Sequence, residues 1–334
     1  MLKNKIITIT GGTGSFGKKI IPELLKTYKP KEIRVFSRDE MKQWHLQEKY
    51  TKQKKIKFII GDVRDSESLR RSIKGSDYVI HAAATKIVPT AEYNPSECIK
   101  TNVFGAMNVI NECISSKVKK VIALSTDKAC NPINLYGATK LCSDKLFVAA
   151  NFLENNINTK FSVVRYGNVM GSRGSVIPFF LNQKKTGSFT ITDKKMTRFM
   201  ITLKEATDLV KYVFSDMSGG EIYISKIPSM KILDIATAIQ SNNKIKITGV
   251  RPGEKMHEVM ISKEDSFYTY EYKKYYKILP SLNSTYKKKS YIKNGNKVQK
   301  NFEYSSDTNT RWMTKKNLDK WLSDYIKSED YNKI

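Results

Sequence analysis

The stretch Ile6-Ile7-Thr8-Ile9-Thr10-Gly11-Gly12-Thr13-Gly14-Ser15-Phe16-Gly17 decides the fold. A β-rich apolar run passes directly into a glycine turn, and the amphipathic residues 18–28 follow. A strand, a glycine-rich turn and a helix in this order are the context of a dinucleotide fingerprint. The glycines, spaced G-x-x-G-x-x-G, allow a tight turn and a close approach of the backbone to a pyrophosphate. We expect cofactor contacts from Gly11, Thr13, Gly14, Ser15, Phe16 and Gly17.

The same alternation continues along the first half of the chain. Strand-like apolar runs lie at residues 6–10, 32–37, 55–60, 77–83, 119–124 and 161–166. Helical segments separate them, and the longest, residues 92–116, is expected to form a single helix. Strands that alternate with helices predict a parallel sheet with right-handed crossovers. We therefore expect an α/β fold with a Rossmann-type doubly wound parallel sheet.

The residues after the second strand bear on the choice of cofactor. An acidic residue there holds the adenosine 2′-hydroxyl of NAD, whereas an arginine accommodates the 2′-phosphate of NADP. The chain has Ser37-Arg38-Asp39, with the arginine before the acid, which favours NADP over NAD. The competing interpretation makes Arg38 a solvent-exposed turn residue. Further cofactor contacts are expected from Lys42, Asp62, Val63, Ala82, Ala83, Lys86 and Asn168.

The composition of the chain changes after residue 166. Polar glycine loops and arginine-bearing loops alternate with short helices and strands, and lysine, serine and asparagine increase from about residue 263. We divide the chain into residues 1–166, a dinucleotide-binding domain to which some later segments return, and residues 167–334. The second part is expected to be mainly a smaller substrate-binding lobe with an irregular C-terminal extension.

The charge of +27 on 334 residues first suggests a nucleic-acid-binding protein. However, the excess is almost entirely lysine, since only ten residues are arginine, and it is spread along the chain. Arginine is the residue that recognises phosphates and bases with two parallel hydrogen bonds. We therefore assign the lysines to solvated surfaces and expect no nucleic-acid partner.

The four cysteines and the apolar segments indicate the compartment. Cys98, Cys113, Cys130 and Cys142 show neither paired spacing nor histidine partners, so we expect reduced thiols and no metal site. No apolar run approaches the roughly 18 residues of a membrane span, and the N-terminus shows no cleavable signal pattern. The expected location is cytoplasmic, without membrane insertion.

A second stretch, residues 125–140, concentrates reactive groups immediately after the fifth strand. Its sequence is STDKACNPINLYGATK, and Tyr136 and Lys140 stand one helical turn apart on the same face. A tyrosine with the usual pKa of about 10 is only about 0.1% ionised at pH 7. A nearby ammonium favours the phenolate, so the pair can take a hydroxyl proton while hydride leaves to a nicotinamide. Asp127 and Lys128 are either an acid–base pair or an ion pair that caps a loop.

With these motifs, and with RYGNVMGSRGS, MTRF and RPGEK further on, the chain resembles the extended short-chain dehydrogenase/reductase family. Its dehydratases of nucleotide sugars usually carry Thr-Asp-Glu after the fifth strand, where this chain has Thr126-Asp127-Lys128. That departure is similar to the configuration-inverting UDP-N-acetylglucosamine 4,6-dehydratases of pseudaminic acid biosynthesis and flagellin glycosylation. The related membrane-anchored and C5-retaining enzymes have methionine where Tyr136 stands. The similarity covers residues 1 to about 262.

The resemblance implies a mechanism and a set of catalytic residues. Tyr136, assisted by Lys140 and accompanied by Ser125, would deprotonate the sugar 4-hydroxyl as hydride leaves C4. Lys128 would then remove the C5 hydrogen, and Asp127 would protonate the departing 6-hydroxyl. Return of hydride to C6 and reprotonation of C5 on the opposite face would give a 4-keto-6-deoxy sugar. The resemblance also implies a homo-oligomer.

For the substrate, UDP-N-acetylglucosamine, we look for guanidinium groups that can hold phosphate. The predicted substrate contacts are Lys86, Asn168, Arg173, Ser175, Thr190, Arg198, Arg251 and Glu254. Three positions depart from the family pattern and would change the fit of the sugar: Thr85, Ile87 and Met200. Two other functions stay open: a nucleotide-sugar 4-epimerase, which needs no Asp-Lys pair, and a non-enzymatic NADP-sensing protein.

Overall fold

A computed structural model describes residues 2–153, 158–172, 174–184, 187–242, 244–282 and 289–327. The opening strand, β1 (Ile6–Thr10), lies inside a ten-stranded sheet of these residues. The parallel part of this sheet has the order β3 (Ile56–Ile60), β2 (Glu32–Ser37), β1, β4 (Tyr78–His81), β5 (Lys120–Thr126), β6 (Lys160–Tyr166) and β10 (Ile222–Ser225). The reversal of order at β1 is that of a doubly wound sheet, so the predicted fold is confirmed.

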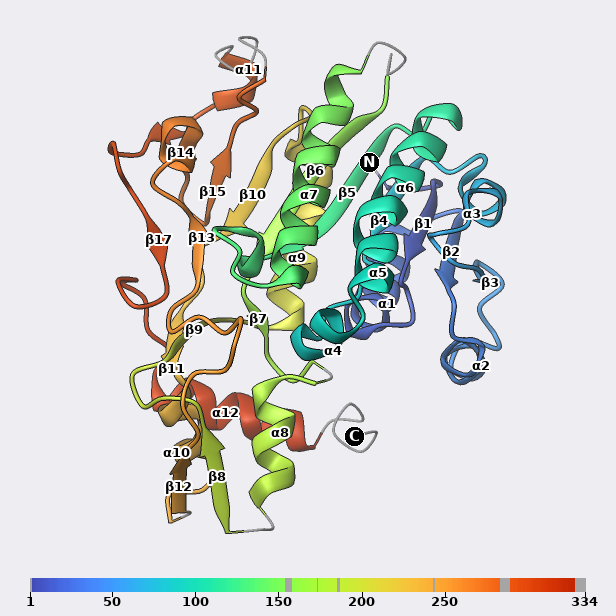
Figure 1. Cartoon of the computed structure of the whole chain (residues 1–334). Coiled ribbons are helices and arrows are strands. Elements are labelled where there is room, and N and C mark those ends of the chain that lie inside the picture. The colour runs from blue at the N-terminus through green and yellow to red at the C-terminus, as the bar shows by residue number, and fades with distance from the viewer. Residues whose placement is uncertain are drawn as a thin grey trace.

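Helices cover both faces of the sheet, which explains why its central strands are buried on both sides. On one face α3 (Ser66–Ile73), α6 (Gly105–Ser115) and α7 (Leu135–Ala149) pack side by side (Figure 1). On the other face α1 (Ser15–Tyr28) packs against α9 (Leu203–Asp216). The short helix α2 (Glu40–Glu48) follows β2 at the edge.

The predicted single helix at residues 92–116 is wrong in its first part. The segment consists of α4 (Val88–Tyr93), α5 (Pro95–Ile99), a π-helical turn (Lys100–Phe104) and α6. The break lies at Asn94, whose φ of −131° is not helical. Asn94 precedes Pro95, and a residue before proline is disfavoured in the helical region.

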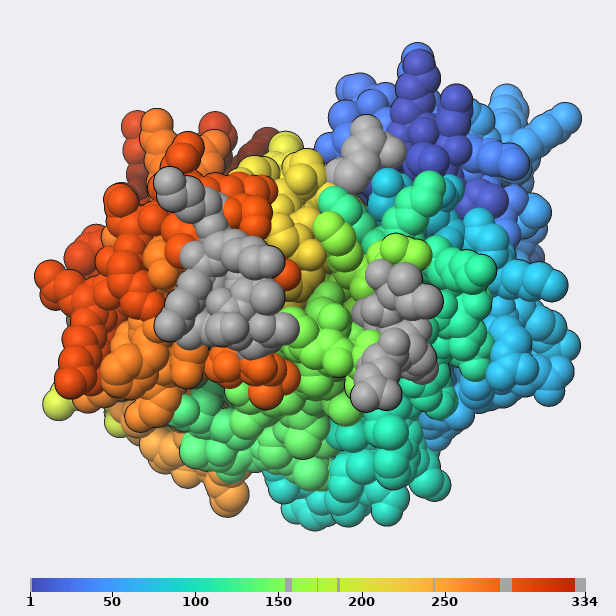
Figure 2. Space-filling model, turned by 90° about the horizontal axis from the view of Figure 1, so that it is seen from above, coloured from blue at the N-terminus to red at the C-terminus, as the bar shows by residue number. Residues whose placement is uncertain are grey.

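The C-terminal segment also differs from the prediction of an irregular extension of the small lobe. Strands β14 (Thr269–Glu271), β15 (Tyr275–Ile278) and β16 (Asn296–Lys297) continue the large sheet beyond β10 in antiparallel fashion. All four residues of β15 are buried. An added antiparallel pair covers the edge of β10, which would otherwise present unpaired backbone groups. Figure 2 shows the result: the C-terminal segments in orange and the N-terminal ones in blue form opposite flanks of the molecule.

The smaller lobe has a hydrophobic cluster of its own. It is built from α8 (Val176–Gln183), α10 (Ile232–Ile239), α12 (Lys315–Ile326) and the parallel pair β8 (Ser188–Ile191) and β12 (Lys244–Ile247). Two further small sheets lead to it: β7 (Asn168–Val169), β9 (Thr197–Ile201) and β11 (Ser229–Lys231); and β13 (Val259–Ile261) with β17 (Tyr304–Ser305). The lobe lies beyond the carboxyl ends of the parallel strands (Figure 1). None of the helices in the described ranges has the length and apolarity to cross a membrane.

Candidate active site

A cavity of about 1040 Å³ lies between the carboxyl edge of the sheet and the small lobe. It is continuous from the β1–α1 turn, past the end of β5, to the loops that carry Arg198 and Arg251. Of the predicted residues that the structure describes, all but Gly17 and Asp127 line it. Arg173, a predicted substrate contact, lies outside the described residues. The structure therefore brings the predicted cofactor and substrate residues together in one cavity.

The glycine turn is shaped to receive a pyrophosphate. Gly11 has a φ of +67°, and a Cβ placed on it would lie 2.7 Å from the backbone nitrogen of Ala83. A Cβ on Gly17 would lie 2.0 Å from the carbonyl oxygen of Gly12, so this glycine lets α1 start directly against the turn. Backbone that passes this closely, at the N-terminus of a helix, suits the phosphates of a dinucleotide. The residues present thus fit the expected cofactor.

At the end of β2 the basic side chains surround two carboxylates, those of Asp39 and Asp62. Asp39 caps α2 by accepting a hydrogen bond from the backbone nitrogen of Lys42 at 2.8 Å, and its second oxygen pairs with the Lys42 ammonium. Arg38 is exposed, with Nη1 3.7 Å from Asp62. Although burial raises the pKa of Asp62, its hydrogen bonds from Arg64, which sequence reasoning missed, bring that pKa below its usual value. Both carboxylates therefore have cationic partners from the protein.

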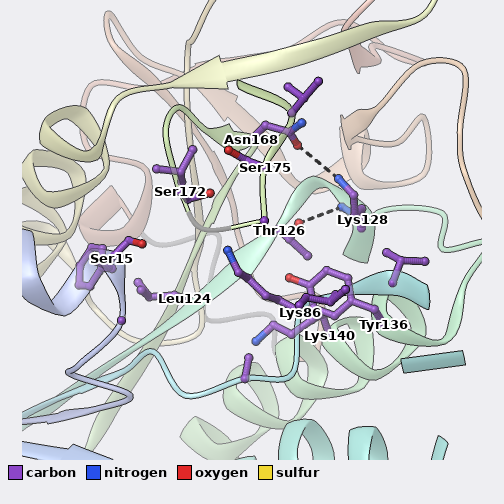
Figure 3. Close-up of a pocket in the computed structure, with 18 of the residues that line it drawn as sticks. Ser15, Lys86, Leu124, Thr126, Lys128, Tyr136, Lys140, Asn168, Ser172 and Ser175 are labelled. Atoms are coloured by element: carbon purple, nitrogen blue, oxygen red, sulfur yellow. Dashed lines mark hydrogen bonds between the residues drawn. The ribbon is translucent and has the colours of Figure 1, made fainter. Parts of the chain in front are cut away.

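Tyr136 and Lys140 lie on the first turns of α7, whose N-terminus Asn134 caps by accepting from the backbone nitrogen of Gly137 at 2.7 Å. Both side chains project to the cavity, with Lys86 beside them (Figure 3). Burial raises the pKa of Tyr136 to about 12, against the opposing effects of the Lys128 charge and a hydrogen bond with Thr126. Burial also lowers the pKa of Lys140. The tyrosine is therefore a neutral phenol at pH 7 in the free protein, and the lysine charge that favours its phenolate there is that of Lys128.

The hydroxyl group next to Tyr136 belongs to Thr126 and not to Ser125. Ser125 Oγ donates to Asp144 Oδ2 at 2.8 Å, and the same oxygen lies 3.2 Å from Nη2 of the buried Arg165. Thr126 donates to Asp127 Oδ1 at 2.9 Å and is hydrogen-bonded to Tyr136. Ser125 lines the cavity but bonds Asp144, so Thr126 is a further hydroxyl group, beside the tyrosine, that sequence reasoning missed.

Asp127 and Lys128 belong to a larger cluster of buried charges. Lys128 Nζ lies 3.1 Å from Asp127 Oδ1, 3.0 Å from Glu258 Oε1 and 3.4 Å from Asn168 Oδ1 (Figure 3 shows the last contact). Arg198 Nε lies 3.8 Å from the same oxygen of Glu258. We call Asp127, Lys128, Arg198 and Glu258 the acid–base cluster. Sequence reasoning missed Glu258, although a lone glutamate before the apolar run Val-Met-Ile was a detectable signal.

The acid–base cluster rests as ion pairs. Burial lowers the pKa of Lys128, but the carboxylates of Asp127 and Glu258 outweigh burial and raise it above its usual value. Among the described residues, Asp127 Oδ2 and Glu258 Oε2 are buried without a hydrogen-bond partner. Buried carboxylate oxygens of this kind are costly unless a ligand or a proton joins them. The cluster is therefore suited to proton transfer and not only to stabilising the fold.

The remaining predicted substrate residues line the far end of the cavity. Arg198 is buried, and its Nη1 donates to the carbonyl oxygens of Thr197 and Met256. Arg251 is 59% exposed, with Nε 3.8 Å from Glu254. Thr190 accepts a hydrogen bond from Gln183 at 2.7 Å. Ser175 precedes α8, and its buried Oγ has no partner in the described part of the chain.

Only one of the three departures from the family pattern meets the cavity. Ile87 lines it. Thr85 is instead held through its backbone, which exchanges hydrogen bonds with the Asn102 side chain. Met200 is 1% exposed and packs in the cluster of the small lobe. A change in the fit of the sugar is therefore expected from Ile87 alone.

Two relatives match this chain over almost its full length. The UDP-N-acetylglucosamine 4,6-dehydratase (inverting) of Campylobacter jejuni (strain 81-176) is 54% identical over 95% of this chain and 97% of the relative. A UDP-glucose 4-epimerase of Rickettsia akari is 43% identical over 98% of this chain and 99% of the relative.

Among solved structures, that of Pen from Bacillus thuringiensis superposes with a TM-score of 0.87 at 39% identity, over 97% of this chain and 99% of the other. A family model described as "Polysaccharide biosynthesis protein" matches residues 7–280. The resemblance to nucleotide-sugar dehydratases predicted from the motifs is thereby confirmed. The chain belongs to the polysaccharide biosynthesis protein family.

Proposed function

We propose that this protein is a UDP-N-acetylglucosamine 4,6-dehydratase, a hydro-lyase that inverts the configuration at C5. The observation that carries the proposal is the position of Lys128. It borders the same cavity as Tyr136 and pairs with Asp127 at 3.1 Å. A base for C5 and an acid for the 6-hydroxyl are the two groups that elimination requires beyond oxidation of C4. The 54% identity to an inverting dehydratase supports the same reaction.

The proposed cofactor is NADP. When bound, it would accept hydride from C4 and return it to C6. Gly11, Gly14 and the N-terminus of α1 would hold the pyrophosphate. Asp39 is already engaged as the cap of α2 and by Lys42, so it is poorly placed to accept the ribose hydroxyls that identify NAD. Arg38, more than half exposed beside it, leaves a guanidinium for a 2′-phosphate.

The first proton transfer follows from the hydrogen bonds of Tyr136. Because its pKa is about 12, Tyr136 carries its own proton at pH 7. To accept the 4-hydroxyl proton, Tyr136 would have to pass that proton onward in the same step. Thr126 bonds both Tyr136 and Asp127, so it offers a route from the phenol to the carboxylate. Asp127 would thus receive a proton during the oxidation step and deliver it to the departing 6-hydroxyl. Each proton in this route is accounted for by one bond broken and one bond formed.

The resting charge of Lys128 is the principal barrier to its role as a base. Reference pKa values of about 10.4 and 3.9 favour the Lys-Asp ion pair over the neutral pair by roughly 9 kcal/mol in water. A sugar that fills the cavity would exclude water and remove hydration from both charges. The neighbouring cation of Arg198 also disfavours the ammonium. Once neutral, Lys128 would remove the C5 hydrogen, which the C4 ketone makes acidic.

For the diphosphate of UDP we propose Arg251 and Ser175. Arg251 is exposed at the cavity and can turn its fork onto phosphate oxygens. Ser175 lies at the N-terminus of α8, where the helix dipole favours an anion, and its hydroxyl has no partner among the described residues. Arg198 is less suited to this role because carbonyl groups and Glu258 already surround it.

A mass measurement tests the proposed reaction. We expect the protein with NADP to convert UDP-N-acetylglucosamine into a product lighter by one water, with one deuterium at C5 when the reaction runs in D₂O. A second candidate function is that of a nucleotide-sugar 4-epimerase, and the observation behind it is the 43% identity to the UDP-glucose 4-epimerase of Rickettsia akari. An epimerase would give a product of unchanged mass, and an NADP-sensing protein would leave the sugar unaltered. Proton couplings of the product distinguish inverted from retained C5.

We further propose that the protein acts in the cytoplasm as a homo-oligomer, and that its product enters pseudaminic acid synthesis for flagellin glycosylation. The nucleotide substrate and the similarity to the Campylobacter dehydratase support this assignment. Sedimentation of the purified chain measures the oligomer, and loss of glycosylated flagellin in a deletion strain tests the pathway.

A further inference from the structure

Glu258 is held in place at the edge of the cavity by the backbone around it. It directly precedes β13 and is 1% exposed, yet it is part of the cavity wall. Its backbone nitrogen donates to Ser306 Oγ at 2.9 Å, and its carbonyl accepts from the Ser306 nitrogen at 2.8 Å. These two bonds fix the side chain opposite Lys128, at the 3.0 Å that separates Oε1 from Nζ. Loop movement therefore does not need to bring the two groups together.

Lys128 has two carboxylates within reach, and they differ as proton acceptors. Asp127 Oδ1 accepts from both Lys128 and the Thr126 hydroxyl. Glu258 Oε1 has the Lys128 ammonium as its close donor, since Arg198 stands 3.8 Å away. Oε1 of Glu258 thus has fewer close donors than Oδ1 of Asp127, which leaves it freer to accept a proton. Glutamate is also intrinsically the weaker acid of the two. Both comparisons make Glu258 the better acceptor.

We propose that Glu258 takes the ammonium proton of Lys128 and holds it while Lys128 acts as the base toward C5. In this step an N–H bond of Nζ breaks and an O–H bond forms on Glu258, so an ion pair becomes an amine and a carboxylic acid. No other reactant is needed. The inference rests on the proposed dehydratase function and adds a positioning residue that acts through Lys128. It also gives a role to the cation of Arg198, which would disfavour the ammonium further once Glu258 is neutral.

The charged groups around this pair are few. Lys128 faces Asp127, Glu258 and Arg198, and its charge also acts on Tyr136. Next to Glu258 in the sequence, His257 is hydrogen-bonded through Nδ1 to Thr197 at 2.8 Å. In a protein without the Glu258 carboxylate, and with Asp127 already holding the proton from Tyr136, the ammonium proton would have to leave to solvent. The rate would then depend on pH through the small neutral fraction of Lys128.

The test compares the pH dependence of turnover in wild type, Glu258→Gln and Glu258→Met, each with NADP and UDP-N-acetylglucosamine. We expect both variants to lose at least about 100-fold in kcat at pH 7, with KM changed less than about threefold. In the variants, the neutral fraction of Lys128 rises about tenfold per pH unit at pH values below the Lys128 pKa. The ratio of wild-type to variant kcat should therefore fall by about tenfold per pH unit between pH 6 and 9. Glu258→Asp, which keeps a carboxylate, should show a ratio that does not vary with pH.

A matched control is Glu112→Gln. Glu112 is also a buried carboxylate with a cationic partner, Arg70 at 3.0 Å, but it lies on α6 away from the cavity. Its replacement should leave the pH profile unchanged. A pH-independent ratio in either Glu258→Gln or Glu258→Met, or turnover within about threefold of wild type, overturns the inference. If wild type itself releases no water from the sugar, the proposed function fails and this inference fails with it.

Discussion

Replacement of Lys128 by methionine separates the chemistry of this site from its contribution to stability. Methionine keeps the volume of the side chain and removes its charge and its proton-accepting nitrogen. If Lys128 is the C5 base, the variant should lose about 10²- to 10⁴-fold in kcat, the usual contribution of a positioned acid or base. Exchange of the C5 hydrogen with D₂O should fall by the same factor. Substrate binding should change little, because the proposed diphosphate contacts lie at the far end of the cavity.

The expected loss of stability can be worked from two distances. At 3.0 and 3.1 Å from Glu258 and Asp127, the ammonium attracts each carboxylate by about 5.5 kcal/mol at an effective dielectric constant of about 20. The variant loses both attractions but need not keep two unpaired carboxylates buried, since it can protonate one carboxyl, and at pH 7 that costs about 3.7 kcal/mol from a reference pKa of 4.3. We therefore expect the free energy of unfolding to fall by at most about 4 kcal/mol at pH 7, the usual scale for breaking a buried ion pair.

The pH dependence of this loss has a definite sign. In the variant the carboxyl pKa in the folded state is raised above its unfolded value, so the penalty is absent below pH 4.3 and grows as pH rises. At pH 5 the loss should be only about 1 kcal/mol. In wild type the raised pKa of Lys128 keeps the ammonium throughout neutral pH, so its stabilisation is lost only when pH rises through that pKa.

Urea unfolding at pH 5 and pH 7 measures the stability change, and proton NMR in D₂O measures exchange at C5. Lys277→Met is the matched control. Lys277 lies in β15, away from the cavity, is fully buried and pairs with Asp216 at 2.7 Å. The substitution should destabilise the fold without slowing exchange. Near-normal C5 exchange in the Lys128 variant would refute its assignment as the base. A loss of stability equal at both pH values would refute the electrostatic account.

Three further outcomes follow from the cofactor site and the core. Arg38→Ala should weaken NADP binding by about 10- to 100-fold, because it removes a hydrogen bond from a charged group, and should leave NAD binding unchanged. Fluorescence titrations measure both affinities, and equal effects on the two cofactors would contradict the 2′-phosphate role. Gly11→Ala should destabilise the fold by at least about 1–2 kcal/mol in thermal unfolding and weaken cofactor binding, because its φ is +67° and the new Cβ would press on Ala83. Burial lowers the pKa of His81 to about 3, so wild type should lose stability as pH falls from 6.5 toward 3, while His81→Gln should show a flatter acid-unfolding profile by circular dichroism.

The sequence was sufficient where a local pattern determines a local structure. The glycine spacing at residues 11–17 predicted both the turn and its position after the first strand, because few other residues tolerate that backbone approach. Tyr136 and Lys140 lie on one helix, so their spacing alone predicted a shared face. Alternation of strands and helices predicted the doubly wound sheet, since handedness and connection rules leave few other arrangements.

Contacts between distant segments were not predictable in this way. Glu258 reaches Lys128 across 130 positions of sequence, and its backbone bonds to Ser306, next to the pairing of β13 with β17, hold it there. Ser125 and Thr126 both meet residues of α7, Asp144 and Tyr136, and adjacent hydroxyl residues give no signal for which partner each one takes. The aromatic residues around Tyr275 were interpreted as part of an irregular extension, whereas the structure pairs them as a strand with the edge of β10, a contact that the local sequence does not indicate.

The order in which the chain passes through the two lobes limits how the lobes can move relative to each other and whether either lobe can be produced as a separate fragment. After β6 the chain enters the small lobe, returns to the sheet for β10, leaves again and returns for β14 to β16, and then contributes α12 to the small lobe. The backbone therefore passes between the lobes several times, so rotation about a single hinge could not separate the lobes widely. We expect the chain to unfold in one cooperative transition, and we expect no truncation point that releases either lobe as an independently folding fragment.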